Sequence, residues 1–139
     1  MQLRLRADAQ LAGTFVREVA RFDPPVQNTR RFVAQATTVA GVALQPGDTI
    51  LLLLAAAGRD DNANLQADVF LLERAERQQS GFGHGRHECP GQQLAFAIAT
   101  GALQHLLALP EALDPSALCW TYAPSVNARL PQFFLKEQS

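Results

Sequence analysis

The hydrophobic positions near the N-terminus repeat with the period of a helix. Apolar side chains recur at intervals of four, four and three residues, at Leu11, Phe15, Val19 and Phe22. Because positions three or four apart share one side of an α-helix, this spacing predicts an amphipathic helix whose apolar side faces a core. A residue before a proline is pushed out of helical geometry, so we expect the helix to end at Asp23-Pro24-Pro25.

The pattern that follows is typical of short strands. Residues 31–42 mix Thr and Val at strand-like frequency, and the sequence QPGD at residues 45–48 predicts a turn. Residues 49–54 predict a buried strand, and residues 55–59 a short helix. From residue 60 to residue 80 the pattern becomes polar and irregular, with Asp60-Asp61 expected to begin a turn.

A second apolar helix is predicted over residues 92–109, ended by Pro110. We expect one stripe, spaced mainly at four residues, to lie against the core: Leu94, Ile98, Ala102, Leu106 and Leu109. Two strand candidates follow, at residues 117–122 and 132–136. The order of helix, strands, irregular chain, helix and strands predicts an α+β fold and one domain over residues 1–139.

Composition narrows the protein class. The 139 residues are 47% hydrophobic, which is enough for one core, and 12 Lys+Arg against 13 Asp+Glu give a net charge of −1. This balance does not indicate a nucleic-acid or acidic partner. Neither a signal peptide nor an apolar run long enough for a bilayer is found, so we expect a cytoplasmic protein. The two cysteines lack CxxC or zinc spacing; Cys119 is expected to pack in a strand.

The other cysteine, Cys89, stands between a glycine-rich loop and the second apolar helix. Glycines at 81, 83 and 85 let the backbone turn tightly and approach a flat group closely. Pro90 suits the first position of a helix, which places Cys89 at or beside the N-cap. The helix dipole and unpaired N–H groups there favour a thiolate. The loop therefore has the features that a thiolate ligand of haem iron needs.

Residues 82–95 resemble the cysteine-loop signature of cytochrome P450, the haem-thiolate monooxygenases. The matching positions are Phe82, Gly83, Gly85, His87, Cys89, Gly91 and Leu94-Ala95. The resemblance implies haem b (iron protoporphyrin IX) as cofactor, with Cys89 as the axial ligand of the iron. It implies the C-terminal part of the mainly α P450 fold: an ExxR helix, small strands, a meander, the cysteine loop, a proximal helix and a C-terminal hairpin.

Glu18 and Arg21 match the ExxR pair of that family. Three residues apart on a helix, they can form an ion pair, and the alternative is an exposed pair with little energetic effect. The resemblance gives the pair a structural role in clamping the helix onto the meander. A third, basic member often comes from the meander, but Val69 stands at that position here. We therefore expect an incomplete network.

The resemblance also assigns residues to the haem itself. Arg31 and His87 fall where basic side chains bind the propionates, although a register shift of one residue would exchange Arg31 for Arg30. Phe82 is expected to pack on the proximal side of the macrocycle and shield the sulfur. His84 is a poor alternative axial ligand because it shares a tight turn with Cys89.

Oxygen activation in the family uses a helix with an acid and a threonine, which we do not find in this sequence. Two hypotheses remain. The chain is either the haem-ligating segment of a monooxygenase that inserts one oxygen atom of O2 into an organic substrate, or a non-catalytic haem-binding or interaction remnant. The first implies a missing N-terminal P450 segment, and a ferredoxin-type or reductase electron donor that docks near the exposed Arg86.

Overall fold

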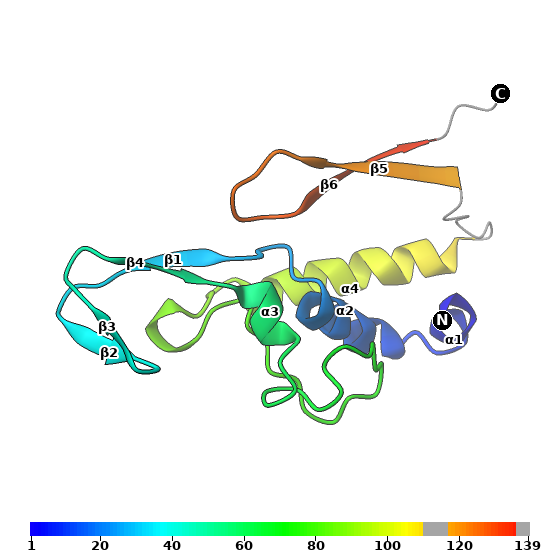
Figure 1. Ribbon diagram of the computed structural model, residues 1–139. Helices are drawn as coiled ribbons and strands as arrows, with labels where there is room; N and C mark the ends of the chain where they lie inside the picture. The colour runs from blue at the N-terminus through cyan, green and yellow to red at the C-terminus, as the bar shows by residue number, and fades with distance from the viewer. Residues whose placement is uncertain (110–116, 136–139) are drawn as a thin grey trace.

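The computed structural model describes residues 1–109 and 117–135. A group of helices lies at the centre, and β ribbons extend from it (Figure 1). The helices are α1 (Gln2–Ala7), α2 (Leu11–Phe22), α3 (Leu54–Gly58) and α4 (Gln92–Ala108), with one 3-10 turn, η1 (Gly85–His87). The strands are β1 (Thr29–Phe32), β2 (Thr37–Val39), β3 (Val42–Leu44), β4 (Thr49–Leu52), β5 (Leu118–Ala123) and β6 (Leu130–Leu135).

The first predicted helix is confirmed as α2. It ends at Asp23, whose N–H donates to the carbonyl of Val19 at 2.8 Å before the two prolines stop the helix. The rings of Phe15 and Phe22 each pack against Phe70, with centroids 5.5 and 5.7 Å apart. The apolar side of α2 therefore holds the irregular segment that follows α3. The short helix α1, which the sequence pattern did not predict, buries Leu5.

The strands pair as three separate antiparallel two-stranded ribbons: β1 with β4, β2 with β3, and β5 with β6. The prediction of a buried strand at residues 49–54 is wrong. β4 ends at Leu52, and its side chains are largely exposed; within the described residues no third strand joins the β1–β4 ribbon. α3 is confirmed, and Asp60 begins a turn by accepting a hydrogen bond from the N–H of Asn62 at 2.8 Å.

The predicted second helix is confirmed as α4, but its expected packing side is wrong. Leu94 and Ile98 are 65% and 64% exposed, whereas Phe96 is 4% exposed and lies against α2 and the cysteine loop. The physical reason is that α4 is apolar on almost every side. A four-residue stripe cannot then reveal which side packs, because the remaining sides are equally able to do so.

The hairpin of β5 and β6 confirms the two C-terminal strand predictions within the described residues; Pro110 and Lys136 lie outside them. Its loop is tied to the chain after α2, where Arg129 bonds to Asp23 at 2.9 Å and Val26 pairs with Ala128. Cys119 lies in β5 as predicted, but it is exposed rather than packed. In residues 1–109 and 117–135, no helix combines the length and apolar character needed to cross a bilayer.

Candidate functional site

Glu18 and Arg21 form a fully buried ion pair. Their side chains are 0% exposed, and the two guanidinium bonds to the carboxylate measure 3.1 and 2.8 Å. The remaining donors of Arg21 reach the carbonyls of Gly58 at 2.7 Å, Ala67 at 2.8 Å and Val69 at 3.2 Å. A buried guanidinium needs every donor satisfied, so this one side chain joins α2 to the end of α3 and to the irregular segment 60–80, the meander. The exposed-pair alternative is excluded.

The prediction of an incomplete network is also wrong. Two meander arginines bind Glu18: Arg74 Nε at 3.2 Å from Oε1, and Arg77 Nε at 3.0 Å from Oε2. Val69 contributes its carbonyl rather than its side chain, accepting from both Arg21 and Arg74. The basic partners therefore come from positions five and eight residues further along the chain. The Glu18 cluster, as we call Glu18, Arg21, Arg74 and Arg77, is complete.

The Glu18 carboxylate stays ionised well into the acidic range. Burial alone raises its pKa, because a low-dielectric surrounding disfavours charge. Hydrogen bonds from Arg21, the Leu71 N–H and Arg77, together with the charge of Arg21, outweigh this effect and lower the pKa from 4.5 to about 2. At neutral pH the ionised carboxylate is therefore the shared anion of all three guanidinium groups.

The loop before α4 is fixed at both of its ends. The Cys89 N–H donates to the carbonyl of Phe82 at 2.8 Å, and the Gln92 N–H donates to the carbonyl of Cys89 at 3.2 Å. Gly83 has a φ of +76°, and a Cβ there would lie 2.3 Å from the carbonyl oxygen of His87. Only glycine fits this point, so the close crossing of the loop over itself depends on it.

The sulfur of Cys89 is accessible. The thiol is free and exposed, and it borders a hollow of about 290 Å³ with Glu88, Pro90 and Gln93. The expectation for Pro90 is wrong: α4 begins at Gln92 with Gly91 as N-cap, so Cys89 lies two residues before the cap. A Cβ at Gly91 would come within 3.8 Å of the sulfur. A Cβ there would therefore make an ordinary van der Waals contact with the sulfur.

Two predicted anion-binding residues meet in one pocket. Arg31 from β1 and His87 from η1 both line a pocket of about 790 Å³, together with Gly83 and His84. Arg31 is half-buried, whereas Arg30 points to the other face of the ribbon and is exposed. The Arg31 guanidinium bonds only locally among the described residues, to Thr29 Oγ1 at 3.1 Å and the Arg30 carbonyl at 2.8 Å.

Phe82 connects the cysteine loop to helix α4. Its ring meets Phe96 of α4 edge-on, with centroids 5.0 Å apart, and the Arg17 guanidinium lies 4.5 Å from the centroid of Phe96. These contacts hold the cysteine loop against α4 and α2. The family model for cytochrome P450 matches residues 1–109, which contain both the Glu18 cluster and this loop. The chain belongs to the cytochrome P450 family.

Individual relatives agree with this assignment. The chain is 36% identical over 127 residues to the biotin biosynthesis cytochrome P450 of Bacillus subtilis, covering 91% of this chain. It is 36% identical over 91 residues to linalool 8-monooxygenase of Pseudomonas putida, covering 66% of this chain and 22% of that enzyme. The match to the biotin biosynthesis P450 covers 32% of that protein, so the chain spans about a third of its length.

Solved P450 structures share the fold. P450BioI, in complex with an acyl carrier protein ligated to hexadec-9Z-enoic acid, superposes with a TM-score of 0.83 at 34% identity, covering 94% of this chain and 34% of that one. CYP109E1 of Bacillus megaterium, in complex with corticosterone, gives 0.86 at 28% identity, covering 96% and 36%. The fold is therefore that of part of a P450.

Cytochromes P450 use haem, iron protoporphyrin IX, as cofactor, and the family contains haem-thiolate monooxygenases. The groups of the cysteine loop and of β1 fit that cofactor chemically. An accessible thiol can supply an anionic ligand to iron, and a guanidinium and an imidazole that border one pocket can pair with carboxylates. The fit rests on the identity and accessibility of these groups.

Sequence reasoning missed Arg74 and Arg77. The family resemblance points to the position of Val69 for the basic residue, whereas both arginines stand further along the same polar stretch. The available signal was that Arg74 and Arg77 are the two basic residues of the stretch 60–80. Because that stretch is irregular, its sequence offers no periodicity from which to tell which side chains turn inward.

Proposed function

We propose that this chain is the C-terminal, haem-proximal part of a cytochrome P450, with Cys89 as the thiolate ligand of the haem iron. One observation carries the proposal: the free, exposed thiol sits directly before α4, on a loop held by backbone hydrogen bonds on both sides. The electron-donating effect of such a sulfur is general chemistry of thiolate-bound haem. Glu18 and Arg21 act at a distance, by fixing the meander that leads into the loop.

Arg31 and His87 would bind the haem propionates. A propionate that is removed from water needs charge-assisted hydrogen bonds, and these two side chains line the same pocket. The half-buried position of Arg31 favours it over the exposed Arg30. Phe82 would shield the sulfur from water, and Gly91 lies beside that sulfur. A drier thiolate accepts fewer hydrogen bonds and donates more charge to the iron.

The monooxygenase reaction of the whole enzyme is part of this proposal, since the matches cover 32% of the biotin biosynthesis P450 and 22% of linalool 8-monooxygenase. When bound, the haem iron activates dioxygen with electrons from a redox partner, so that one oxygen atom enters an organic substrate. The residues described above hold and orient the cofactor; none of them is assigned to the substrate.

A haem titration of the wild type, Cys89→Ser and Cys119→Ser tests the ligand assignment. We expect weak haem binding by the chain alone, because it offers only one wall of the cofactor site. With the rest of a P450 domain supplied, the reduced, carbon-monoxide-bound protein should show a thiolate-type Soret band. Cys89→Ser should lose this band and Cys119→Ser should keep it. Retention of the band in Cys89→Ser would refute the assignment.

We further infer that the electron donor, of ferredoxin or reductase type, docks beside Arg86. This side chain is exposed on η1, three residues before the proposed ligand, and a cation there suits an acidic partner. In the reconstituted enzyme, Arg86→Glu should slow reduction of the haem while its absorption spectrum stays unchanged. Reduction kinetics equal to those of the wild type would remove this part of the proposal.

A further inference from the structure

Asn64 is a buried polar side chain that does not belong to the Glu18 cluster. It lies in the turn after α3, where its backbone N–H donates to the carbonyl of Asp60 at 2.8 Å, and it is 2% exposed. The next residue, Leu65, is 81% exposed. Burying an amide beside an exposed leucine does not follow from hydrophobicity, and a buried amide needs hydrogen-bond partners. The partners of Asn64 therefore show what its burial achieves.

The side-chain amide of Asn64 binds both backbone polar groups of Gln78. Its Oδ1 accepts from the Gln78 N–H at 2.9 Å, and its Nδ2 donates to the Gln78 carbonyl at 3.4 Å. Because a backbone N–H can only donate, the first bond identifies the oxygen of the amide. Nδ2 also donates to the carbonyl of Gly58 at 3.4 Å. One side chain thus ties the end of α3 to the last residues of the meander and restrains Gln78 at two points.

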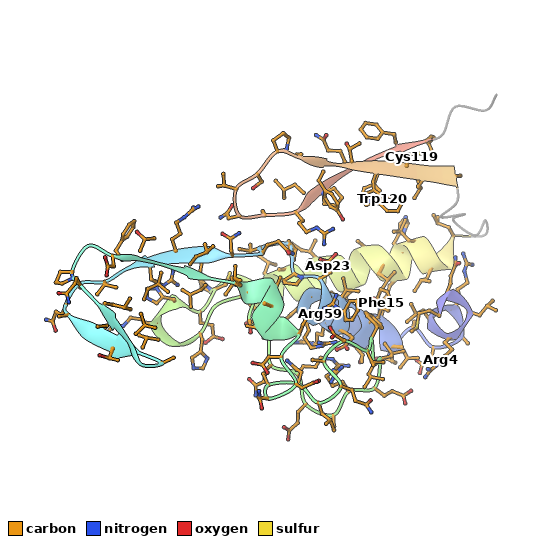
Figure 2. All side chains as sticks on the ribbon, viewed as in Figure 1. Arg4, Phe15, Asp23, Arg59, Cys119 and Trp120 are labelled. Carbon is orange, nitrogen blue, oxygen red and sulfur yellow. The ribbon has the colours of Figure 1, made fainter. Side chains whose placement is uncertain are left out.

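The end of α3 is a firm support for this link. The Gly58 carbonyl accepts from Arg21 Nη1 at 2.7 Å, and a Cβ at Gly58 would lie 2.5 Å from the Arg21 carbonyl oxygen. Arg59 donates to the Phe22 carbonyl at 2.7 Å, and its guanidinium lies 3.4 Å from the centroid of the Phe22 ring. Figure 2 shows Arg59 at the junction of α3 and α2. Asn64 therefore holds Gln78 to a part of the fold that is packed on α2.

Only a short stretch of chain separates Gln78 from the cysteine loop. Phe82, four residues further on, supplies the carbonyl that accepts the Cys89 N–H at 2.8 Å. Between them the backbone passes close to the end of α2, since a Cβ at Gly81 would lie 2.7 Å from the Cβ of Pro24. A stretch of this length that is held at Gln78 has little freedom at Phe82. The position of that carbonyl, and with it the Cys89 backbone, therefore depends on the bonds of Asn64.

We propose that Asn64 is a positioning residue of the cysteine loop: its amide fixes Gln78, and through Gln78 it fixes the backbone that holds Cys89. The inference deepens the proposed function, on which it rests for the role of Cys89 at the haem iron. Gln78 lines the pocket of about 790 Å³ that Arg31 and His87 share, whereas Asn64 does not. Asn64 therefore acts on the site only through the backbone that it holds.

Amide hydrogen exchange of the haem-free full chain, followed by NMR, tests this proposal. Asn64→Leu keeps a side chain of similar size but forms none of the three bonds of the amide. We expect the Gln78 and Cys89 amides of this variant to exchange at least about tenfold faster, because local opening no longer breaks these bonds. The Asp23 amide at the end of α2 should keep its wild-type rate. Since no haem is present, a failure of Cys89 as the iron ligand would leave these rates unchanged.

Gln78→Ala is the matched control. It removes an exposed side chain and keeps both backbone partners of Asn64, so we expect wild-type rates. A wild-type rate at Cys89 in Asn64→Leu would overturn the proposal, because the amide of Asn64 would then only fill space. Equal acceleration at Asp23 and Cys89 would count against it as well, since that marks a loss of overall stability. In the wild type alone, a Gln78 N–H that exchanges as fast as a free amide would refute it whatever the variants do.

Discussion

The Glu18 cluster and the outer side of α4 reverse the usual distribution of polar and apolar groups. Glu18 and Arg21, two charged side chains, are among the most completely buried in the described residues, while Leu94 and Ile98 of α4 are mostly in solvent. Folded proteins normally bury aliphatic side chains and leave charges outside unless those charges are paired. Both regions therefore need a specific explanation, and the explanations differ.

The buried cluster is complete within this chain. Each carboxylate oxygen of Glu18 accepts hydrogen bonds from guanidinium groups. Donors of Arg21 and Arg74 that do not bind the carboxylate reach backbone carbonyls, among them those of the meander. The α4 face has no such completion in residues 1–109 and 117–135. The difference teaches that the meander and α2 form a closed unit, whereas α4 and the hairpin form an open one. Substitutions in the first region should consequently destabilise the free chain strongly, and those on the outer side of α4 should hardly change its stability.

The largest effect is expected for Glu18→Gln. Removing the carboxylate leaves three guanidinium groups without their shared anion, and breaking a buried ion pair costs about 3–5 kcal/mol. Urea unfolding followed by far-ultraviolet circular dichroism measures this loss. Glu73→Gln is the control, because the Arg4–Glu73 pair is exposed, with 57% and 71% of the side chains accessible. An exposed pair contributes at most about 1 kcal/mol, so equal losses for the two variants would contradict a buried, completed cluster.

Acid should weaken the closed unit through the same carboxylate. The pKa of Glu18 is lowered from 4.5 to about 2 in the folded chain, so the unfolded state takes up a proton first as the pH falls. The stabilisation is fully present above about pH 5 and is lost on descending toward pH 2, with a total of about 3 kcal/mol. Comparing the wild type with Glu18→Gln separates the contribution of Glu18 from that of other carboxylates. The difference in unfolding free energy between the two proteins should shrink as the pH falls over this range. A difference independent of pH would contradict the lowered pKa.

The helices, the strands and the cysteine loop could be predicted from the sequence because these features depend on local residue patterns. The end of α2 follows from the two prolines, and the loop follows from glycines and a cysteine at fixed spacing. Arg31 and His87 could also be paired in advance, through their resemblance to family positions, and the structure brings them to one pocket. Their roles at the haem remain predictions.

Which side chains are buried and which are exposed could not be predicted from such local features. The stripe of Leu94, Ile98 and Leu106 has the spacing of a core face, yet it lies in solvent. Because α4 is apolar on almost every side, its sequence does not show which side packs. The burial of Arg74 and Arg77 depends on where an irregular segment turns, and irregular backbone has no period to read. Which side chains end up buried in this chain was decided by long-range packing that its local pattern does not encode.

The smallest effect is expected at Leu94, and it tests the open side of the comparison directly. Leu94→Gln replaces a side chain that is 65% exposed, so the unfolding free energy of the free chain should change by no more than about 0.5 kcal/mol. Phe96→Ala, two residues further along α4, removes a ring that is 4% exposed and should cost about 3–5 kcal/mol. Urea midpoints of the two variants provide the measurement. If Leu94→Gln destabilised the free chain as much as Phe96→Ala, the outer side of α4 would already be packed within this chain, and no covering segment would be needed to explain its apolar row.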